Sequence, residues 1–235
     1  MRAVFLAVAF AVLPGVQATR AQDIGDVVAY AALISTPAAG LAPVPAPYMT
    51  GERQMSVGLA ARYGRMSDQG ITRNAFAADV TFPLGRGSAG LVAGYLNNSC
   101  EGCSGYFVAG AHADAPLVSA GSAGSGLFTV GLDGMLGLAK PTGGTALTLS
   151  ADLPLAVSIA AGRAHVVPFI APGFGFGRLS GGGESESGTR FMLGGGVGLM
   201  DIAPGLGVSV GAKQVFLDGA KTVFGVGLSW LGRKQ

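Results

Sequence analysis

The sequence contains little charge. Its 235 residues include 15 Lys and Arg and 13 Asp and Glu, so 12% of the chain is charged whereas 49% is hydrophobic. A disordered chain shows the opposite balance, and disorder of the whole chain is therefore excluded. A formal net charge of +2 also gives no basic surface of the kind that binds nucleic acid, so no nucleic-acid partner is expected.

Cysteine is scarce as well. Two cysteines, Cys100 and Cys103, are too few for a small disulfide-stabilised scaffold. A zinc site would need two further ligands, and His112 and His165 lie at no matching spacing, so no metal site and no cofactor are expected. The cysteine pair predicts a local disulfide that closes a short loop in an oxidising compartment.

The N-terminus has the layout of a secretory signal peptide over residues 1–21. A basic Arg2 precedes an apolar run that is too short to span a bilayer, and small residues follow. Cleavage could follow Ala18 or Ala21, of which Ala21 is preferred. Removal of Arg2 and Arg20 leaves a neutral mature chain, because both lost charges are basic.

No unbroken apolar segment of helix-spanning length follows the signal peptide. Residues 22–52 form an Ala/Pro-rich lead-in whose stretch 27–51 is uncharged, but four prolines prevent a continuous helix there. The lead-in could be a linker, or it could lie inside a barrel lumen.

From residue 53 onward apolar side chains recur with period two, which predicts β-strands. Near the C-terminus, for example, Phe224, Val226, Leu228 and Trp230 alternate with Gly225, Gly227 and Ser229. Strand lengths of about 9–14 residues are typical of tilted, membrane-spanning strands. The predicted strands are 53–65, 72–84, 88–96, 105–117, 125–139, 145–157, 164–179, 188–201, 206–217 and 221–231.

The face opposite the apolar one consists mostly of Gly, Ala, Ser and Thr, and the chain holds 41 glycines. A soluble sheet would carry Lys, Glu and Gln on that face. The pattern therefore predicts an all-β fold, a closed antiparallel transmembrane β-barrel over residues 53–231 with about ten strands, eight being possible, followed by a tail at 232–235. The expected location is the bacterial outer membrane, and a soluble periplasmic β-fold is the alternative.

The C-terminal third resembles a known family. The segments HVVPFIAPGFGFGRL, TRFMLGGGVGLMDIAPGLGVSVGAKQVF and KTVFGVGLSW, within residues 164–231, resemble the closing strands of small OmpA-like and opacity-type outer-membrane barrels. The resemblance implies roles in envelope integrity, adhesion or small-solute passage. It also implies outer-membrane lipid as a partner, and the barrel-assembly machinery during biogenesis. Lipopolysaccharide is a further expected partner, because basic residues in the outer half of the lumen could hold its phosphates at the rim.

Two motifs could carry chemistry. Residues 85–90 match G-x-G-x-x-G, but the sequence after them predicts a strand where a dinucleotide site needs a helix, so a turn is expected. His112 and Asp114 share one strand face and could orient a general base in a membrane-embedded hydrolase. The preferred interpretation is a hydrogen-bonded polar pair in the lumen, with no catalytic residues.

The remaining polar residues of the small face are expected in the lumen, where opposite charges would pair. The predicted lumenal charges are Arg62, Asp79, His112, Asp114, Asp133, Asp152, Arg178, Arg190 and Lys213. The basic members are expected toward the outer half and the acidic ones toward the periplasmic half, with Asp133 near the middle. The sequence thus predicts a structural or interaction protein of the envelope, with a narrow low-conductance channel as the alternative.

Overall fold

The computed structural model describes residues 55–68, 71–99, 105–122, 126–141, 144–181, 183–216 and 221–233. The predicted signal peptide, the lead-in at 22–52, Cys100 and Cys103 lie outside the described residues. The strands are β1 (Met55–Asp68), β2 (Ile71–Leu84), β3 (Gly87–Ser99), β4 (Tyr106–Ser122), β5 (Gly126–Ala139), β6 (Thr145–Asp152), β7 (Leu155–Ala161), β8 (Ala164–Gly181), β9 (Glu184–Ala203), β10 (Leu206–Val215) and β11 (Lys221–Arg233). No helix in the described part of the chain is long and apolar enough to cross a membrane.

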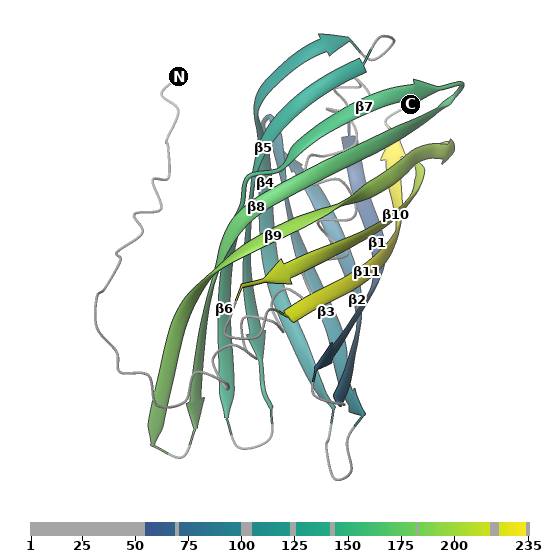
Figure 1. Ribbon diagram of the computed structural model, residues 1–235. Helices are drawn as coiled ribbons and strands as arrows, with labels where there is room; N and C mark the ends of the chain where they lie inside the picture. Colours follow the sequence, from purple (N-terminus) through teal and green to yellow (C-terminus); the bar gives the residue numbers. More distant parts are fainter. Residues whose placement is uncertain are drawn as a thin grey trace.

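The strands form one closed antiparallel barrel (Figure 1). Apart from β6 and β7, which do not pair with each other, each strand pairs with its neighbours in sequence, and β1 pairs with β11, which joins the two edges of the sheet. The strands β6 and β7 both lie between β5 and β8 and together fill one position in the wall, so the barrel has ten positions. The prediction of a closed barrel of about ten strands is confirmed.

The predicted strand 145–157 is interrupted, and this is a correction. Leu153 and Pro154 separate β6 from β7 because proline has no N–H for the strand ladder. Irregular hydrogen bonds bridge the break. Leu153 N donates to Pro172 O at 2.8 Å, and Gly131 N donates to Pro154 O at 2.8 Å. The last strand also continues to Arg233, into the segment expected as a tail.

The two ends of the barrel differ. The terminal end carries Met55 and Arg233, and its hairpins β2–β3, β7–β8 and β9–β10 turn within two residues. The opposite end, which we call the loop end, carries the longer β3–β4, β5–β6 and β10–β11 connections together with the two-residue β1–β2 and β8–β9 connections. The G-x-G-x-x-G match at 85–90 falls on the β2–β3 turn and the start of β3, as expected.

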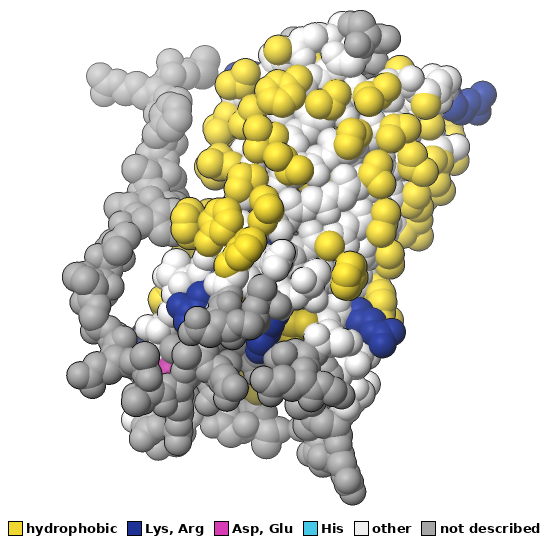
Figure 2. Space-filling model, in the orientation of Figure 1, with side chains coloured by type: hydrophobic (Ala, Val, Ile, Leu, Met, Phe, Trp, Pro, Cys, Tyr) yellow, Lys and Arg dark blue, Asp and Glu magenta, His cyan; other side chains and the backbone are white. Residues whose placement is uncertain are grey.

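The outer wall is apolar. Leu, Val, Ile and Phe side chains are exposed along the strands, and Figure 2 shows them spread over the wall with Lys and Arg mainly toward one rim. In β11, Phe224 is 62% exposed and Trp230 48%, whereas the alternating Val223 is fully buried. An apolar outer face on a closed barrel is the surface that lipid requires, because closure satisfies the backbone hydrogen bonds.

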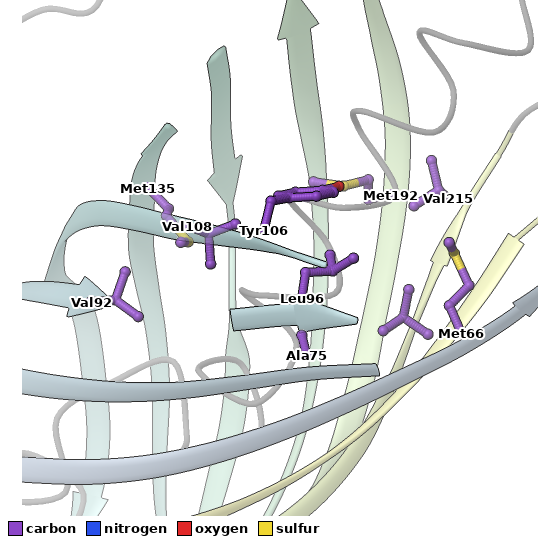
Figure 3. Packing of buried hydrophobic residues seen from close by; sticks show 10 residues of the cluster. Met66, Ala75, Val92, Leu96, Tyr106, Val108, Met135, Met192 and Val215 are labelled. Carbon is purple, nitrogen blue, oxygen red and sulfur yellow. The ribbon is translucent and has the colours of Figure 1, made fainter. Parts of the chain in front are cut away.

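Apolar side chains also line the lumen at two levels. Near the loop end Met66, Leu96, Tyr106, Met192 and Val215 belong to one buried cluster (Figure 3). Near the terminal end a second cluster contains Val167, Phe169 and Met200, among others. The charged residues described next lie on β1, β2, β4, β5, β6 and β10.

Candidate functional site: the lumenal charge network

The first part of the network is centred on Asp79 of β2. Its Oδ2 lies 3.0 Å from Arg62 Nη2 on β1 and 2.6 Å from His112 Nε2 on β4. Thr81 Oγ1 donates to the other carboxylate oxygen at 2.7 Å. Arg62 is 6% exposed and Asp79 5%, so this charge pair is buried in the lumen.

The second part crosses the lumen. Lys213 Nζ on β10 donates to Asp152 Oδ2 on β6 at 2.9 Å. Two strands, β9 and β8, separate β10 from β6 in the wall, so the pair spans part of the interior. Lys213 is fully buried, which is rare for a lysine unless it is paired.

A row of carboxylates connects the two parts. Asp114 on β4 is the register partner of Asp133 on β5, which is in turn the register partner of Asp152 on β6. Ser88 Oγ of β3 donates to Asp114 Oδ1. The network therefore runs through register positions and hydrogen bonds from β1 through β6, and Lys213 adds β10.

Glycines on adjacent strands make room for the polar side chains. A Cβ on Gly90 would lie 2.3 Å from His112 Nε2, and a Cβ on Gly173 would lie 2.1 Å from Asp152 Oδ1. Gly90 and Gly173 are the direct register partners of His112 and Asp152. Part of the high glycine content therefore reflects the room that lumenal polar side chains need, because any larger residue at these positions would displace a polar group.

The expectation that opposite lumenal charges pair agrees with these contacts, since Arg62 contacts Asp79 and Lys213 contacts Asp152. The physical reason is desolvation, since a charge in a closed lumen is stabilised only by an adjacent opposite charge. These contacts do not contradict the expected sorting of charge by depth, because Lys213 lies two residues from the loop end of β10 whereas Asp79 lies nearer the terminal end of β2.

One predicted lumenal residue, Arg178, lies on the outer wall, and another, Arg190, lies near the loop end. On β8, Gly175 and Gly177 face the lumen, whereas Phe174 faces outward. Arg178 is exposed and alternates in phase with Phe174, so the assignment of Arg178 to the lumen is wrong. Arg190 has the inward parity of β9 but is partly exposed near the loop end, where its Nη1 donates to the Thr189 carbonyl at 2.9 Å.

The sequence analysis missed one buried cation and a serine. Arg73 on β2 is 7% exposed and lies on the same face of the strand as Asp79, six residues earlier. The alternation of side chains along β2 could therefore have predicted its lumenal position. Ser88 has the parity of Gly90, but only the fold brings it to Asp114. Neither belongs to a metal site, since the described residues hold no group of three or more metal-ligating side chains.

The hydrolase hypothesis can be compared with this geometry. His112 Nε2 contacts Asp79, whereas Asp114 accepts a hydrogen bond from Ser88. The two contacts are separate, so they do not form a serine–histidine–aspartate relay in which the histidine links the other two residues. Ser158 Oγ lies 3.2 Å from His165 Nδ1, but Ser158 is fully buried and so lacks access to a substrate.

The outer wall carries a second arrangement, near the loop end. The ring centroids of Tyr63 and Phe76 lie 5.0 Å apart in a tilted arrangement, and those of Tyr95 and Phe107 lie 5.2 Å apart in an edge-to-face arrangement. Because Phe76 and Tyr95 are register partners, the four rings form one aromatic row across β1–β4. A second row consists of Phe174 on β8, Phe191 on β9 and Phe216, which directly follows β10. The exposed Arg65 and Arg178 lie beyond these rows toward the loop end.

Comparisons with known proteins concern the architecture. No family model matches the chain, and no curated protein matches it. Among solved structures, it is similar to the β-domain of the Bordetella autotransporter BrkA, with 13% identity, a TM-score of 0.46 and coverage of 75% of this chain and 99% of that one. It is also similar to the N-terminal β-barrel domain of Pseudomonas aeruginosa OprF, with 10% identity, a TM-score of 0.35 and coverage of 76% and 98%.

A further similar structure is the Acinetobacter baumannii outer membrane protein Omp33, with 12% identity, a TM-score of 0.30 and coverage of 77% of this chain and 99% of that one. These identities and TM-scores are low, but the barrel of this chain is itself closed and has an apolar outer wall that lipid can contact. Its ten wall positions, apolar outer face and polar interior are the architecture of an outer-membrane β-barrel.

Proposed function

We propose that the protein resides in the bacterial outer membrane as a non-conducting structural or interaction component of the envelope. The observation that supports this is the burial of the lumenal charges. Asp152 is 3% exposed and Lys213 fully buried, whereas the charges that line a water-filled pore are hydrated. The short turns at the terminal end favour its placement on the periplasmic side.

Planar-bilayer recording tests this proposal. The mature chain, beginning after Ala21, is expected to insert and give no reproducible conductance step. Insertion is verified separately in liposomes of the same lipid by the fluorescence of Trp230, the sole tryptophan, whose side chain lies on the outer wall. A reproducible step from inserted protein would refute the proposal and favour the narrow channel.

The interaction partner that the outer wall fits best is lipopolysaccharide. Arg65 and Arg178 are exposed near the aromatic rows at the loop end, and guanidinium groups bind phosphate through two parallel hydrogen bonds. Tyr63 and Phe107 supply rings of the kind found at membrane interfaces. Assembly by the barrel-assembly machinery is a separate expectation, which follows from the family resemblance.

Thermal unfolding in lipid tests this contact. Lipopolysaccharide should raise the unfolding temperature of the wild-type barrel more than phosphatidylethanolamine does. The variant Arg65→Gln/Arg178→Gln should lose most of that difference, whereas the lumenal variant Ser88→Ala should keep it. An unchanged response in the double arginine variant would refute the contact.

A further inference from the structure

The strand β4 extends beyond its neighbour β3 at the terminal end of the barrel. Figure 1 shows β4 and β5 meeting at the end where the C-terminus lies. Toward this end, the last register pair between β3 and β4 joins Ser88 to Asp114. Among the described residues, 115–121 of β4 therefore have no register partner on β3, although β5 pairs with the same stretch on its other side. We call Ala115–Gly121 the β4 edge.

The β4 edge is exposed on both faces and carries no charge. Exposed positions of β4 alternate with less exposed ones near the loop end, but every residue from Leu117 to Gly121 is exposed. Leu117 is 53% exposed and Val118 56%. Natural sheets often protect a free edge with charged side chains, and none occurs in this stretch. The edge is therefore open to an added strand.

The free hydrogen-bonding groups of the edge follow from the strand ladder. Gly131 N of β5 donates to Pro154 O, so the backbone of Gly131 faces away from β4. Residues of an antiparallel strand alternate between its two neighbours, so Val130 bonds instead with its register partner Val118 on β4. The N–H and C=O of the next residue, Ser119, therefore point out of the edge, where an added strand can form a pair of backbone hydrogen bonds.

The β2–β3 turn closes the inner end of the edge. A Cβ on Gly87 would lie 3.1 Å from Ala115 Cα, so Arg86, the residue before Gly87, lies in line with the edge. A strand that pairs with Ser119 antiparallel to β4 runs in the direction of β3, and its C-terminal end therefore points at this turn. It must end there, because the turn blocks its path and Pro116 has no N–H for it.

The side chain of Arg86 favours a carboxylate at that point. Arg86 is exposed, and a guanidinium binds a carboxylate through two parallel hydrogen bonds. A free C-terminus thus has the charge and the position that the edge requires. A second copy of the barrel fits less well, because two barrels in one membrane point the same way and their edges could pair only in the less stable parallel arrangement.

We propose that the β4 edge binds the C-terminal segment of a periplasmic protein as an added antiparallel strand, with its terminal carboxylate at Arg86. The segment is uncharged apart from that carboxylate, because the edge has no charge to pair with another. Backbone hydrogen bonds at Ser119 supply affinity, and Val118 and Ala120 contact side chains on one face of the segment. The proposal rests on the proposed function for its periplasmic placement, and it names the class of partner for the interaction role.

Peptide binding to the mature barrel in detergent tests the proposal. The probe is a short coumarin-labelled peptide of alternating threonine and valine with a free C-terminus, and its binding is followed by fluorescence anisotropy. The matching C-terminal amide should bind about three- to tenfold more weakly, because it lacks the charge that Arg86 binds. Equal binding of the acid and the amide would overturn the proposal.

Variants locate the binding site. Arg86→Gln should bind acid and amide alike, whereas the control Arg163→Gln, in the β7–β8 turn at the same end, should keep the preference for the acid. Ser119→Pro removes the N–H of the edge and should weaken binding at least about tenfold, whereas Ser119→Ala keeps that N–H and should bind like the wild type. Unchanged binding by Ser119→Pro would overturn the proposal. If Ser119→Pro does not fold, Arg86→Gln still decides.

The same sample separates the two proposals. A conductance step from a barrel that prefers the acid refutes only the non-conducting function. A silent barrel that binds acid and amide alike refutes only the binding edge. If the barrel instead forms a dimer that Ser119→Pro dissociates, a second copy occupies the edge and the proposed partner is wrong.

Discussion

Removal of the Lys213 charge is the sharpest test of the lumenal network. Its Nζ lies 2.9 Å from Asp152 Oδ2, and Lys213 is fully buried. At that distance the attraction is about 6 kcal/mol with an effective dielectric constant of about 20, most of which is offset by the desolvation of both charges. The pair therefore contributes little net stability, but the loss of one partner leaves the other charge unpaired. Lys213→Met, which keeps the apolar stem over Gly194, should lower the free energy of unfolding by about 3–5 kcal/mol.

The assay is urea unfolding of the barrel in detergent micelles, followed by Trp230 fluorescence. Lys213→Met/Asp152→Asn removes both charges and should be destabilised less than Lys213→Met alone, because the Asp152 carboxylate is no longer left without its cation. The two substitutions should thus couple by at least about 2 kcal/mol in a double-mutant cycle. A loss below about 1 kcal/mol for Lys213→Met, or strict additivity in the cycle, would refute the description of a buried, mutually dependent pair.

Three further predictions use the same unfolding assay. Val226→Lys on the outer wall should cost about 2–4 kcal/mol if it lies near the bilayer midplane, and a neutral result would mean that this face does not contact lipid. Gly90→Ala should cost about 1–3 kcal/mol because the added Cβ displaces the His112 ring. The control Gly134→Ala, whose added Cβ has its nearest neighbours 3.9 Å away, should be nearly neutral, and equal effects of the two variants would contradict the explanation that Gly90 makes room for His112. Asp201 has a φ of 56°, and its Oδ1 accepts a hydrogen bond from Gly205 N at 3.2 Å. Asp201→Ala should therefore cost about 1–2 kcal/mol and Asp201→Asn less, because asparagine tolerates this φ and keeps the acceptor; the reverse order would contradict this account.

Much of the wall was predictable because side chains alternate strictly along a strand. The predicted strand 125–139 corresponds to β5 at Gly126–Ala139, and its apolar face, with Phe128 and Leu132, points outward as expected. The apolar face was assigned to lipid on the basis of composition, because the opposite face of Gly, Ala, Ser and Thr is a poor surface for contact with bulk water. Arg178 was misplaced although the same alternation, followed along β8, gives it the outward parity of Phe174.

The partners within the lumen were less predictable. His112 and Asp114 are two residues apart on one strand, and this proximity suggested a pair. Instead His112 contacts Asp79, which is 33 residues away, and Asp114 accepts from Ser88, which is 26 residues away. Such contacts depend on the stagger between neighbouring strands, and stagger is set by pairing along the whole wall rather than by local sequence.

By itself, the sequence determined that this chain forms strands, that one face of each strand is apolar, and that the wall can close around about ten positions. These properties follow from local periodicity and from the need to satisfy backbone hydrogen bonds in lipid. Only the tertiary structure decided which charges meet, where Pro154 interrupts the wall, and which glycines give space to Asp152 and His112. Those features depend on which residues face each other across strands and across the lumen, and closure of the barrel is what brings them together.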